Sequence, residues 1–443
     1  MRGLKRNPWL IGRGVLLAIL LVVGGQSRAD VFTDQSGSIV VFPKVIADGT
    51  RDTIIHMANT SNMPAQAHCF YVNALGSCSV TVSQSCRSNL DCRPPACPTC
   101  DPTEFCRPLW EETDFDLFLT AQQPTQWRVS TGRVTDVTFP ACNLESGLKV
   151  YGHGMNGLNF CDCEVDPING GLICPGFPPG TGSQGSFAVI PVGTAFEGEL
   201  KCIQTLDDFQ TPLSQNSLKG EALVETIASG EFSVYNAIGI SGLQANNSNN
   251  DLLLDNVEYN ACPRNLIMNH YADGATDDFS GATVHTELSL VPCTELFEEQ
   301  LPTRSRALFS IVNEFEQPLS AEITFDCYLN RRLTDISSQF TEANIGTQFA
   351  KTRITPPSSS ICQTGDNTGL PCATNADCPN FLTTPGGTPL GCRPWTGLLG
   401  VAEEFHTLSV TVPITTTITG TAAMDLFMEG SRSFDIIVQP EEE

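Results

Sequence analysis

The stretch Cys97-Pro98-Thr99-Cys100 has the spacing of a reactive site, because a CxxC pair can carry out disulfide exchange. A thioredoxin-like site places its first cysteine at a helix N-terminus, where the pKa of the thiol falls. Here other cysteines and several prolines surround the pair, which favours a structural disulfide. The alternative is a zinc site formed by Cys86, Cys92, Cys97 and Cys100, although this spacing is irregular for zinc.

A glycine-rich stretch, Gly152-His153-Gly154-Met155-Asn156-Gly157, fits the GxGxxG pattern. Dinucleotide binding requires a strand before this pattern and a helix after it, so that the helix N-terminus receives the pyrophosphate. The residues that follow lead to Cys161-Asp162-Cys163 and show no helical pattern. We therefore expect a glycine-rich loop.

The histidines offer one further route to chemistry. His56 and His68 fall on neighbouring expected strands, where they could hold a metal ion together or form a half-buried cross-strand pair. No HExxH sequence and no GxSxG nucleophile elbow occurs. The sequence therefore assigns no catalytic, cofactor-binding or metal-binding residue, and no cofactor.

One cysteine pattern occurs twice in the chain. Its members are Cys78, Cys86, Cys92 and Cys106 in the first copy, and Cys362, Cys372, Cys378 and Cys392 in the second. In both copies Asn-x-Asp precedes the third cysteine and Arg-Pro follows the fourth. The pattern predicts a disulfide-bonded insert that the chain carries twice, with two disulfides within each copy. Three connectivities are open for each set of four cysteines.

The remaining cysteines indicate further cross-links. Cys97 and Cys100 have no counterparts in the second copy, so they are expected to pair with each other or with a cysteine outside the insert. Two more disulfides are predicted, Cys69–Cys202 and Cys262–Cys293. Because the chain has 19 cysteines, an odd number, at least one is left free or bonds another chain.

The N-terminus has the pattern of an export signal. A basic start is followed by the apolar run 14–23 and by an acceptable cleavage site, Ser27-Arg28-Ala29. We expect residues 1–29 to be removed as a signal peptide, and a retained membrane anchor is the alternative. No second apolar stretch of about 18 residues, the length of a membrane-spanning helix, occurs. Since the many cysteines suit an oxidising compartment, the protein is expected to be secreted or at the cell surface, with the periplasm as the alternative.

The chain is strongly acidic, with 49 acidic and 24 basic residues and a net charge of −25. Such a charge repels nucleic acid and anionic lipid, so neither is an expected partner. The expected partners are other cell-surface or matrix components and, through the odd cysteine, another chain joined by a disulfide. Binding of a divalent cation to the acidic surface stays open.

Helical periodicity is nearly absent, whereas short runs rich in Val, Ile, Thr and Phe are frequent, such as 38–46 and 407–418. These runs predict an all-β fold with two immunoglobulin-like antiparallel β-sandwich domains, each with a disulfide-bonded Cys-rich insert. The expected division is a signal peptide at 1–29, a first sandwich at 30–245 with inserts at about 77–106 and 141–185, a connector at 246–281, and a second sandwich at 282–443 with an insert at about 361–392.

The two halves share a further pattern around Asn59 and Asn313. Each asparagine ends a strand-like run, and the next run carries Cys69 in the first half and Cys327 in the second. An asparagine that bonds its own backbone can open a turn, so strand, turn and strand are predicted in both halves. We expect the two segments to superpose, with each insert following the second strand of its segment.

These paired segments and their Asn-x-Asp-Cys inserts resemble uncharacterised secreted proteins of environmental Gram-negative bacteria, which carry similar inserts and immunoglobulin-like sandwich segments. The resemblance covers most of the expected mature chain. It implies export and a sandwich fold, and it brings no catalytic residues.

Three classes of function remain. The favoured one is a non-enzymatic, secreted or cell-surface, structural or adhesive protein, because duplicated sandwiches and disulfide inserts suit it. The alternative is an extracellular module that binds carbohydrate or another small ligand. In that case Trp110, Trp127 and Trp395 would form a stacking platform, whereas their plainer role is to anchor the ends of the inserts. The third class is a secreted hydrolase, which would show a cleft with titratable groups of shifted pKa.

Overall fold

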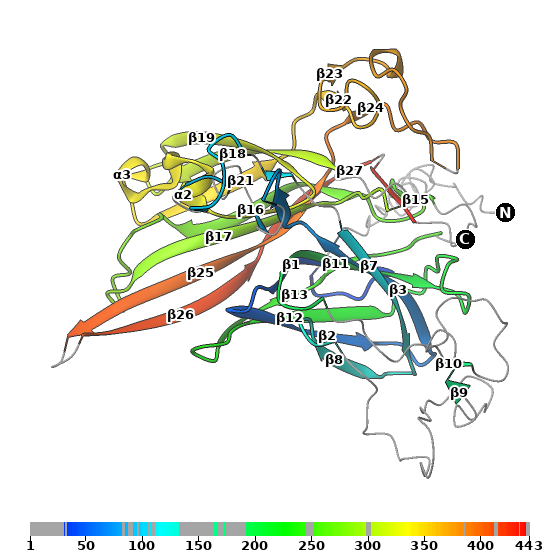
Figure 1. The fold of residues 1–443 in the computed structure, drawn as a ribbon, viewed down its shortest axis with the longest axis horizontal. Helices are drawn as coiled ribbons and strands as arrows, with labels where there is room; N and C mark the ends of the chain where they lie inside the picture. The colour runs from blue at the N-terminus through cyan, green and yellow to red at the C-terminus, as the bar shows by residue number, and fades with distance from the viewer. Residues whose placement is uncertain are drawn as a thin grey trace, which may run out of the picture.

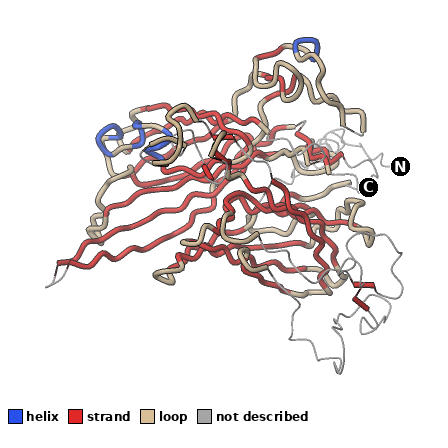
Figure 2. The backbone as a smooth tube through the Cα atoms, viewed as in Figure 1, coloured by secondary structure: helices blue, strands red, loops and turns tan. Residues whose placement is uncertain are grey.

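The computed structural model is built almost entirely of antiparallel β-strands. Strand accounts for 57% and helix for 4%, which confirms the all-β class with sandwich-like packing. Figure 2 shows strands throughout, with short helices at one end of the second half and in an insert. The structure describes residues 31, 33–81, 85–86, 92–94, 97–104, 106–107, 111–132, 164–165, 172–173, 192–244, 251–297, 303–384, 386–411, 415–433 and 435–439.

The first sandwich is formed by nine strands in one continuous hydrogen-bonded set. Its strands are β1 (Ile39–Ala47), β2 (Arg51–Asn59), β3 (Ala65–Asn73), β7 (Glu111–Leu119), β8 (Pro124–Arg128), β11 (Phe196–Thr205), β12 (Leu218–Thr226), β13 (Glu231–Asn236) and β14 (Ile238–Ile240). One group pairs in the order β8, β2, β12, β13, and the other in the order β7, β3, β11, β1, β14. The two groups are linked by the single pair Ala47↔Asp52, so they can fold face to face around one core.

The second sandwich has a five-stranded and a four-stranded sheet (Figure 1). The five-stranded sheet has the order β19 (Pro318–Asp326), β18 (Arg304–Asn313), β21 (Phe349–Thr355), β16 (Cys262–Tyr271), β27 (Phe427–Arg432). The four-stranded sheet has the order β20 (Leu329–Arg332), β17 (Thr283–Pro292), β25 (Leu398–Thr411), β26 (Thr415–Asp425). Three short helices, α2 (Leu333–Ile336), η3 (Ser338–Phe340) and α3 (Glu342–Ile345), connect β20 to β21, and β15 (Asp251–Leu254) pairs with β28 (Asp435–Val438).

Several predicted element boundaries need correction. The expected strand 38–46 is β1, but the expected strand 407–418 spans the ends of β25 and β26, whose pairing includes Thr411↔Thr415. The expected connector 246–281 contains β15 and β16, and β16 lies within the five-stranded sheet. Sequence periodicity marks strand-like residues, but it does not show where a hairpin reverses or which sheet a strand joins.

Both described inserts are small three-stranded units held by disulfides, as predicted. The first consists of β4 (Gly76–Cys78), β5 (Ser85–Cys86) and β6 (Cys106–Arg107). The second consists of β22 (Ser360–Cys362), β23 (Pro371–Cys372) and β24 (Cys392–Pro394), and it projects at the top of Figure 1. The first and third cysteines are bonded in each copy, as Cys78–Cys92 and Cys362–Cys378. In the second copy the second and fourth are bonded as well, as Cys372–Cys392. Of the predicted insert 141–185, only β9 (Glu164–Val165) and β10 (Leu172–Ile173) lie in the described residues.

The three other disulfide predictions are confirmed. Cys97 bonds Cys100, and the remaining bonds are Cys69–Cys202 and Cys262–Cys293. Cys69 and Cys202 are directly opposed on the paired strands β3 and β11. Among the described cysteines, Cys327 is free and buried.

The predicted equivalence of the two strand–turn–strand segments is wrong. β2 and β3 pair with different neighbours, whereas β18 and β19 pair with each other as a hairpin. The first insert follows β3, but the second follows β21, beyond the three short helices. Cys69 lies in regular strand, whereas Cys327 has φ of +51° and ends β19. The two asparagines do open turns as predicted, because Asn59 Oδ1 accepts from the Ser61 N–H and Asn313 Oδ1 from the Phe315 N–H.

Three central strands of the first sandwich, β1, β3 and β11, are buried on both faces. Phe42 and Leu200 belong to the core of that sandwich, whereas Ile39 and Ile203 belong to a second apolar layer. That junction layer also contains Phe70, Leu252, Val291, Phe297, Leu399 and Ile437, so it joins the two sandwiches. Near-continuous apolar runs such as Ile39–Ala47 are typical of strands that are covered on both sides.

The junction layer makes a testable contribution to stability. Phe70 is fully buried and stacks on Phe297, with ring centroids 4.1 Å apart. Replacing it in Phe70→Ala should lower the free energy of unfolding by about 3–5 kcal/mol, because the lost contacts leave a cavity. Urea denaturation measures this loss. The control Phe279→Ala removes a ring that is 99% exposed, so equal losses in the two variants would contradict the role of the layer.

Candidate functional site

An open depression of about 590 Å³ lies on the outer face of the five-stranded sheet. We call it the sheet-face groove, and its lining residues are Asn269, Ser310, Val312, Asn313, Glu314, Phe349, Ala350, Lys351 and Arg353. They come from β16, β18, β21 and the turn after β18. Sites for small ligands have volumes of about 300–1,000 Å³, so the groove is large enough to hold one.

Strand β21 supplies the centre of the groove. Phe349, Lys351 and Arg353 are exposed, and the residues between them are buried. Because side chains alternate along a strand, these three project from the same face of the sheet. An aromatic ring and two cations therefore stand in a row.

Neighbouring strands place polar groups beside this row. Lys351 is directly opposite Asn269 on β16, and Arg353 is directly opposite Ser310 on β18. Opposed residues on paired strands have Cβ atoms only about 4.5–5.5 Å apart. The cations are thus flanked by an amide and a hydroxyl, which can both donate and accept hydrogen bonds.

The ring of Phe349 is held from one side and open on the other. Its centroid lies 4.1 Å from that of Tyr271, the residue opposite it on β16. The Tyr271 hydroxyl in turn donates to Asp277 Oδ1 over 3.3 Å. Phe349 is still 42% exposed, so part of the ring remains available for contact with a ligand.

The two cations of the groove differ in their partners. Arg353 Nη2 lies 3.0 Å from Glu429 Oε2 on β27, and both side chains are about half exposed. Arginine has five N–H donors, so this ion pair leaves donors for another acceptor. Within the described part of the chain, no carboxylate lies at ion-pair distance from Lys351.

Asn313 fixes the end of the groove. Its buried amide donates to the Ile345 carbonyl over 2.7 Å, and its Oδ1 accepts from the Gln317 N–H over 2.9 Å. The turn between β18 and β19 is thereby tied to helix α3. Glu314 follows Asn313 in this turn and lines the groove.

Two clusters of buried charged side chains lie away from the groove, at the junction between the sandwiches. Lys44 Nζ, which is 1% exposed, lies 2.6 Å from Glu403 Oε2 and 3.1 Å from Glu287 Oε2. Glu287 also lies 3.0 Å from Arg51 Nη1. Burial alone would lower the pKa of Lys44, but Glu403 and Glu287 raise it above its ordinary value. This lysine cluster links β1 to β17 and β25 as an ion-paired bridge.

A second buried cluster surrounds Lys201 on β11. Its Nζ lies 2.8 Å from Glu295 Oε1 and 3.1 Å from Glu199 Oε2. Burial raises the pKa of Glu295 well above its usual range, and the attraction of Lys201 only partly opposes this. Glu295 therefore retains its proton to a higher pH than an ordinary glutamate. Cys327 is affected by the same cluster, since burial first and then Glu295 raise the pKa of its thiol.

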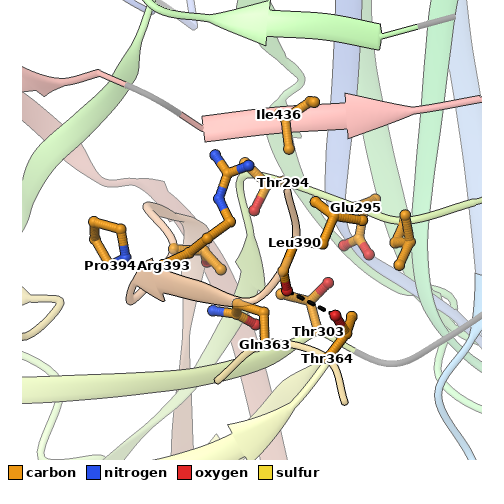
Figure 3. A pocket seen from close by; sticks show the side chains of 11 residues that line it. Thr294, Glu295, Thr303, Gln363, Thr364, Leu390, Arg393, Pro394 and Ile436 are labelled. Carbon is orange, nitrogen blue, oxygen red and sulfur yellow. Dashed lines mark hydrogen bonds between the residues drawn. The ribbon is translucent and has the colours of Figure 1, made fainter. Parts of the chain in front are cut away.

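A small cavity lies beside this cluster, where the second insert meets the sandwich (Figure 3). It is lined by Glu295, Arg393, Gln363 and Ile436, among others, and the Thr364 hydroxyl donates to the Leu390 carbonyl over 2.7 Å. Its volume is about 50 Å³. Such a volume accommodates a few water molecules but no organic substrate.

The zinc alternative for the CxxC segment does not fit the structure, and the segment forms bends and turns rather than the helix N-terminus of a thioredoxin-like site. Cys97 is bonded to Cys100, Cys92 is bonded to Cys78, and Cys86 is also in a disulfide. Zinc binds thiolates, which a disulfide does not offer. The other sequence motif, the glycine-rich stretch Gly152 to Gly157, lies outside the described residues.

The predicted histidine pair is not formed. His56 Nδ1 lies 2.8 Å from Glu221 Oε1 on β12, and His68 Nδ1 lies 2.7 Å from Asp116 Oδ1 on β7. β2 and β3 are consecutive in the sequence but do not pair, so the two histidines are not cross-strand neighbours. The two-histidine metal site is therefore wrong.

The predicted tryptophan platform is wrong for Trp127 and Trp395, the two of its residues that the structure describes. Trp127 is 3% exposed and its indole N–H donates to the Tyr71 hydroxyl over 2.6 Å, and Trp395 is 5% exposed. Both are buried, and Trp110 lies outside the described residues. The exposed aromatic ring of the groove is Phe349, which the sequence did not single out. The alternation Phe-x-Lys-x-Arg at 349–353 is the signal that could have indicated it.

Neither a protein family model nor a curated protein matches the chain. In the described part of the chain, no helix is both long and apolar enough to cross a membrane. Function must therefore be inferred from the geometry of this molecule.

The lysine cluster predicts a pH dependence of stability. Burial would raise the pKa of Glu287, but Lys44 and Arg51 prevail and lower it to about 2 from 4.5. A carboxylate whose pKa falls on folding stabilises the protein above its unfolded pKa, and this contribution is lost as the pH falls from about 5 towards 2. Glu287→Gln should lower the free energy of unfolding at neutral pH by up to about 3 kcal/mol. It should also make the free energy of unfolding fall less steeply as the pH is lowered from about 5 towards 2.

Chemical denaturation across this pH range tests the expectation. The matched control is Glu322→Gln, which removes an exposed ion pair with Arg306 and should cost about 0–1 kcal/mol. If the free energy of unfolding of Glu287→Gln fell with pH as steeply as that of the unchanged protein, Glu287 would not be the source of this pH dependence.

The buried thiol gives a second prediction for this region. Cys327 should resist alkylation by iodoacetamide in the native protein, at a rate at least roughly 100-fold below that in the unfolded chain, because its modification requires local opening. Peptide mapping by mass spectrometry, before and after denaturation, locates the label. Rapid labelling of Cys327 in the native protein would contradict its burial.

Proposed function

We propose that this chain is a secreted, non-enzymatic structural or adhesive protein that assembles through the hairpin formed by β25 and β26. The observation that carries the proposal is the long projecting arm that this hairpin forms (Figure 1). We define the arm as residues 407–421, most of which lie beyond the point where β17 stops pairing with β25 at Thr283↔Thr407. From there the hairpin continues as two strands up to Thr411↔Thr415.

Among the described residues, the outer edge of β26 has no strand hydrogen-bonded to it, although β13 of the first sandwich contacts its base. β26 is the terminal strand of its sheet, so one row of its backbone groups has no strand partner there. Natural proteins usually blunt such an edge with charges, prolines or bulges. Residues 415–424 contain none of the charged residues and no proline, and the register with β25 is unbroken. By contrast, the edge strand β7 carries Glu111, Glu112, Asp114 and Asp116.

The surface chemistry of the arm favours a second copy of the chain as its partner. Val410 and Ile418 are exposed, and a Cβ atom added to Gly420 would meet nothing within 4 Å. A glycine in a strand allows another backbone to approach closely. Since the molecule carries a net charge of −25, two copies repel each other over most of their surfaces, and the uncharged arm is a place where they can pair edge to edge.

The base of the arm is rigidly held. Val401 of β25 packs into the core of the first sandwich, and Ala402 packs into that of the second. Glu403 accepts from Lys44 and from the Ser233 hydroxyl, both of the first sandwich. An arm fixed to both sandwiches transmits their orientation to a partner, as a structural subunit requires.

Export and duplication belong to the same proposal. The N-terminal pattern and the disulfides support a secreted or cell-surface protein, with residues 1–29 removed. We also propose that the sandwiches are immunoglobulin-like and that the two inserts are copies of one module. Their matching strand orders and their shared first-to-third disulfides support this.

Lysines on the free edge test the assembly. In the variant Thr417→Lys/Thr419→Lys, paired arms would bring like charges together, which costs several kcal/mol. The dissociation constant for self-association should therefore rise at least roughly tenfold, a change equal to about 1.4 kcal/mol. Sedimentation velocity over a concentration series measures this constant.

The matched control is Ser320→Lys/Thr324→Lys, which places two lysines on the exposed edge strand β19. It should associate as the unchanged protein does. A protein that stays monomeric at all concentrations, or a control that is impaired as strongly, would refute assembly through the arm.

A further inference from the structure

We propose that the sheet-face groove binds an acidic oligosaccharide, with its uronate carboxylate on Lys351 and a sugar ring on Phe349. This proposal does not depend on the arm, because the groove lies on the five-stranded sheet and the arm extends from the four-stranded one.

The groove contains a cation, Lys351, that has no carboxylate at ion-pair distance in the described part of the chain. The chain has 49 acidic and 24 basic residues, and the two buried lysines among the described residues, Lys44 and Lys201, are paired with carboxylates. Lys351 is instead exposed on an open sheet face, with an asparagine and a valine opposite it. In so acidic a protein, a lysine without a carboxylate partner is available for an anionic ligand.

An aromatic ring, that of Phe349, lies two residues away from Lys351 on the same strand. Phe349 and Lys351 project from the same face of β21, and successive side chains on one face of a strand lie about 7 Å apart. This separation suits a ligand that offers a flat C–H surface and, on the same or the next ring, an anionic group. A sugar acid has both features, whereas a free inorganic anion has no surface to place on Phe349.

Hydrogen-bonding groups surround the row of exposed side chains on β21. Asn269 and Ser310 can each donate and accept, and Glu314 accepts at the rim. Sugar hydroxyls also donate and accept, so they match such a mixed lining. Arg353, whose pairing with Glu429 leaves donors free, extends the cationic row for a second carboxylate.

The shape of the groove suits an extended ligand. It is an open depression of about 590 Å³ on a sheet that is held by the turn at Asn313, so little ordering is needed on binding. An open groove accepts an internal stretch of a linear polymer, whereas a closed pocket would accept only its end.

Binding of trigalacturonic acid, measured by isothermal titration calorimetry with the full mature chain, tests the proposal. We expect Lys351→Ala to weaken binding at least roughly tenfold, because a hydrogen bond to a charged group contributes about 1.5–3 kcal/mol. Phe349→Ala should weaken it severalfold, and Lys351→Arg should retain most of the affinity. Added salt should weaken binding to the unchanged protein.

Two controls make the outcome decisive. Lys219→Ala removes another exposed lysine, on β12 of the first sandwich, and should bind as the unchanged protein does. Maltotriose, which has no carboxylate, should bind at least roughly tenfold more weakly. The proposal is overturned if trigalacturonic acid does not bind, if maltotriose binds equally well, or if Lys351→Ala and Lys219→Ala have equal effects. The arm variant Thr417→Lys/Thr419→Lys should retain sugar binding, so the two proposals fail independently.

Discussion

Two buried lysines at the junction between the sandwiches constrain the rest of the molecule. Lys44 and Lys201 project from central strands of the first sandwich, and each meets a carboxylate of the second. The surrounding apolar layer favours contact but is not directional, whereas a buried charge is tolerated only opposite its partner. We infer that the ion pairs select one relative orientation of the sandwiches, because another docking would leave the Lys44 ammonium buried without a counter-charge and Lys201 with Glu199 of its own strand alone.

This orientation determines which surfaces remain exposed. The first sandwich covers the side of the four-stranded sheet, where Val401 and Glu403 of β25 enter the junction. The five-stranded sheet packs its inner face against the second core, so its outer face is open and carries the groove. Beyond the junction, β25 and β26 continue as the arm. The groove and the arm are therefore separate consequences of one docking geometry.

The cysteines show how similar local sequences acquire different roles. Cys69 and Cys327 follow comparable strand and turn patterns, and both asparagine turns form. Only Cys69 faces a second cysteine, because β3 pairs with β11, which carries Cys202. Cys327 ends β19, next to the buried Lys201 cluster, and its thiol stays protonated and free. A cysteine on the surface would be available to another chain, whereas Cys327 is buried.

The sequence by itself determined the strand content, the turns at Asn59 and Asn313 and the two disulfide inserts. These features follow from local periodicity, turn chemistry and cysteine spacing. The pairs Cys69–Cys202 and Cys262–Cys293 were predicted correctly, but the bond between Cys69 and Cys202 forms only because β3 and β11 lie side by side. The partners of each strand were decided only by the tertiary structure, and with them the failure of the His56–His68 site and the burial of Trp127. The groove likewise depends on β16, β18 and β21 lying side by side, although Asn269, Ser310 and Lys351 are far apart in the sequence. Pairing between distant strands is chosen by packing of the whole core, which no local pattern records.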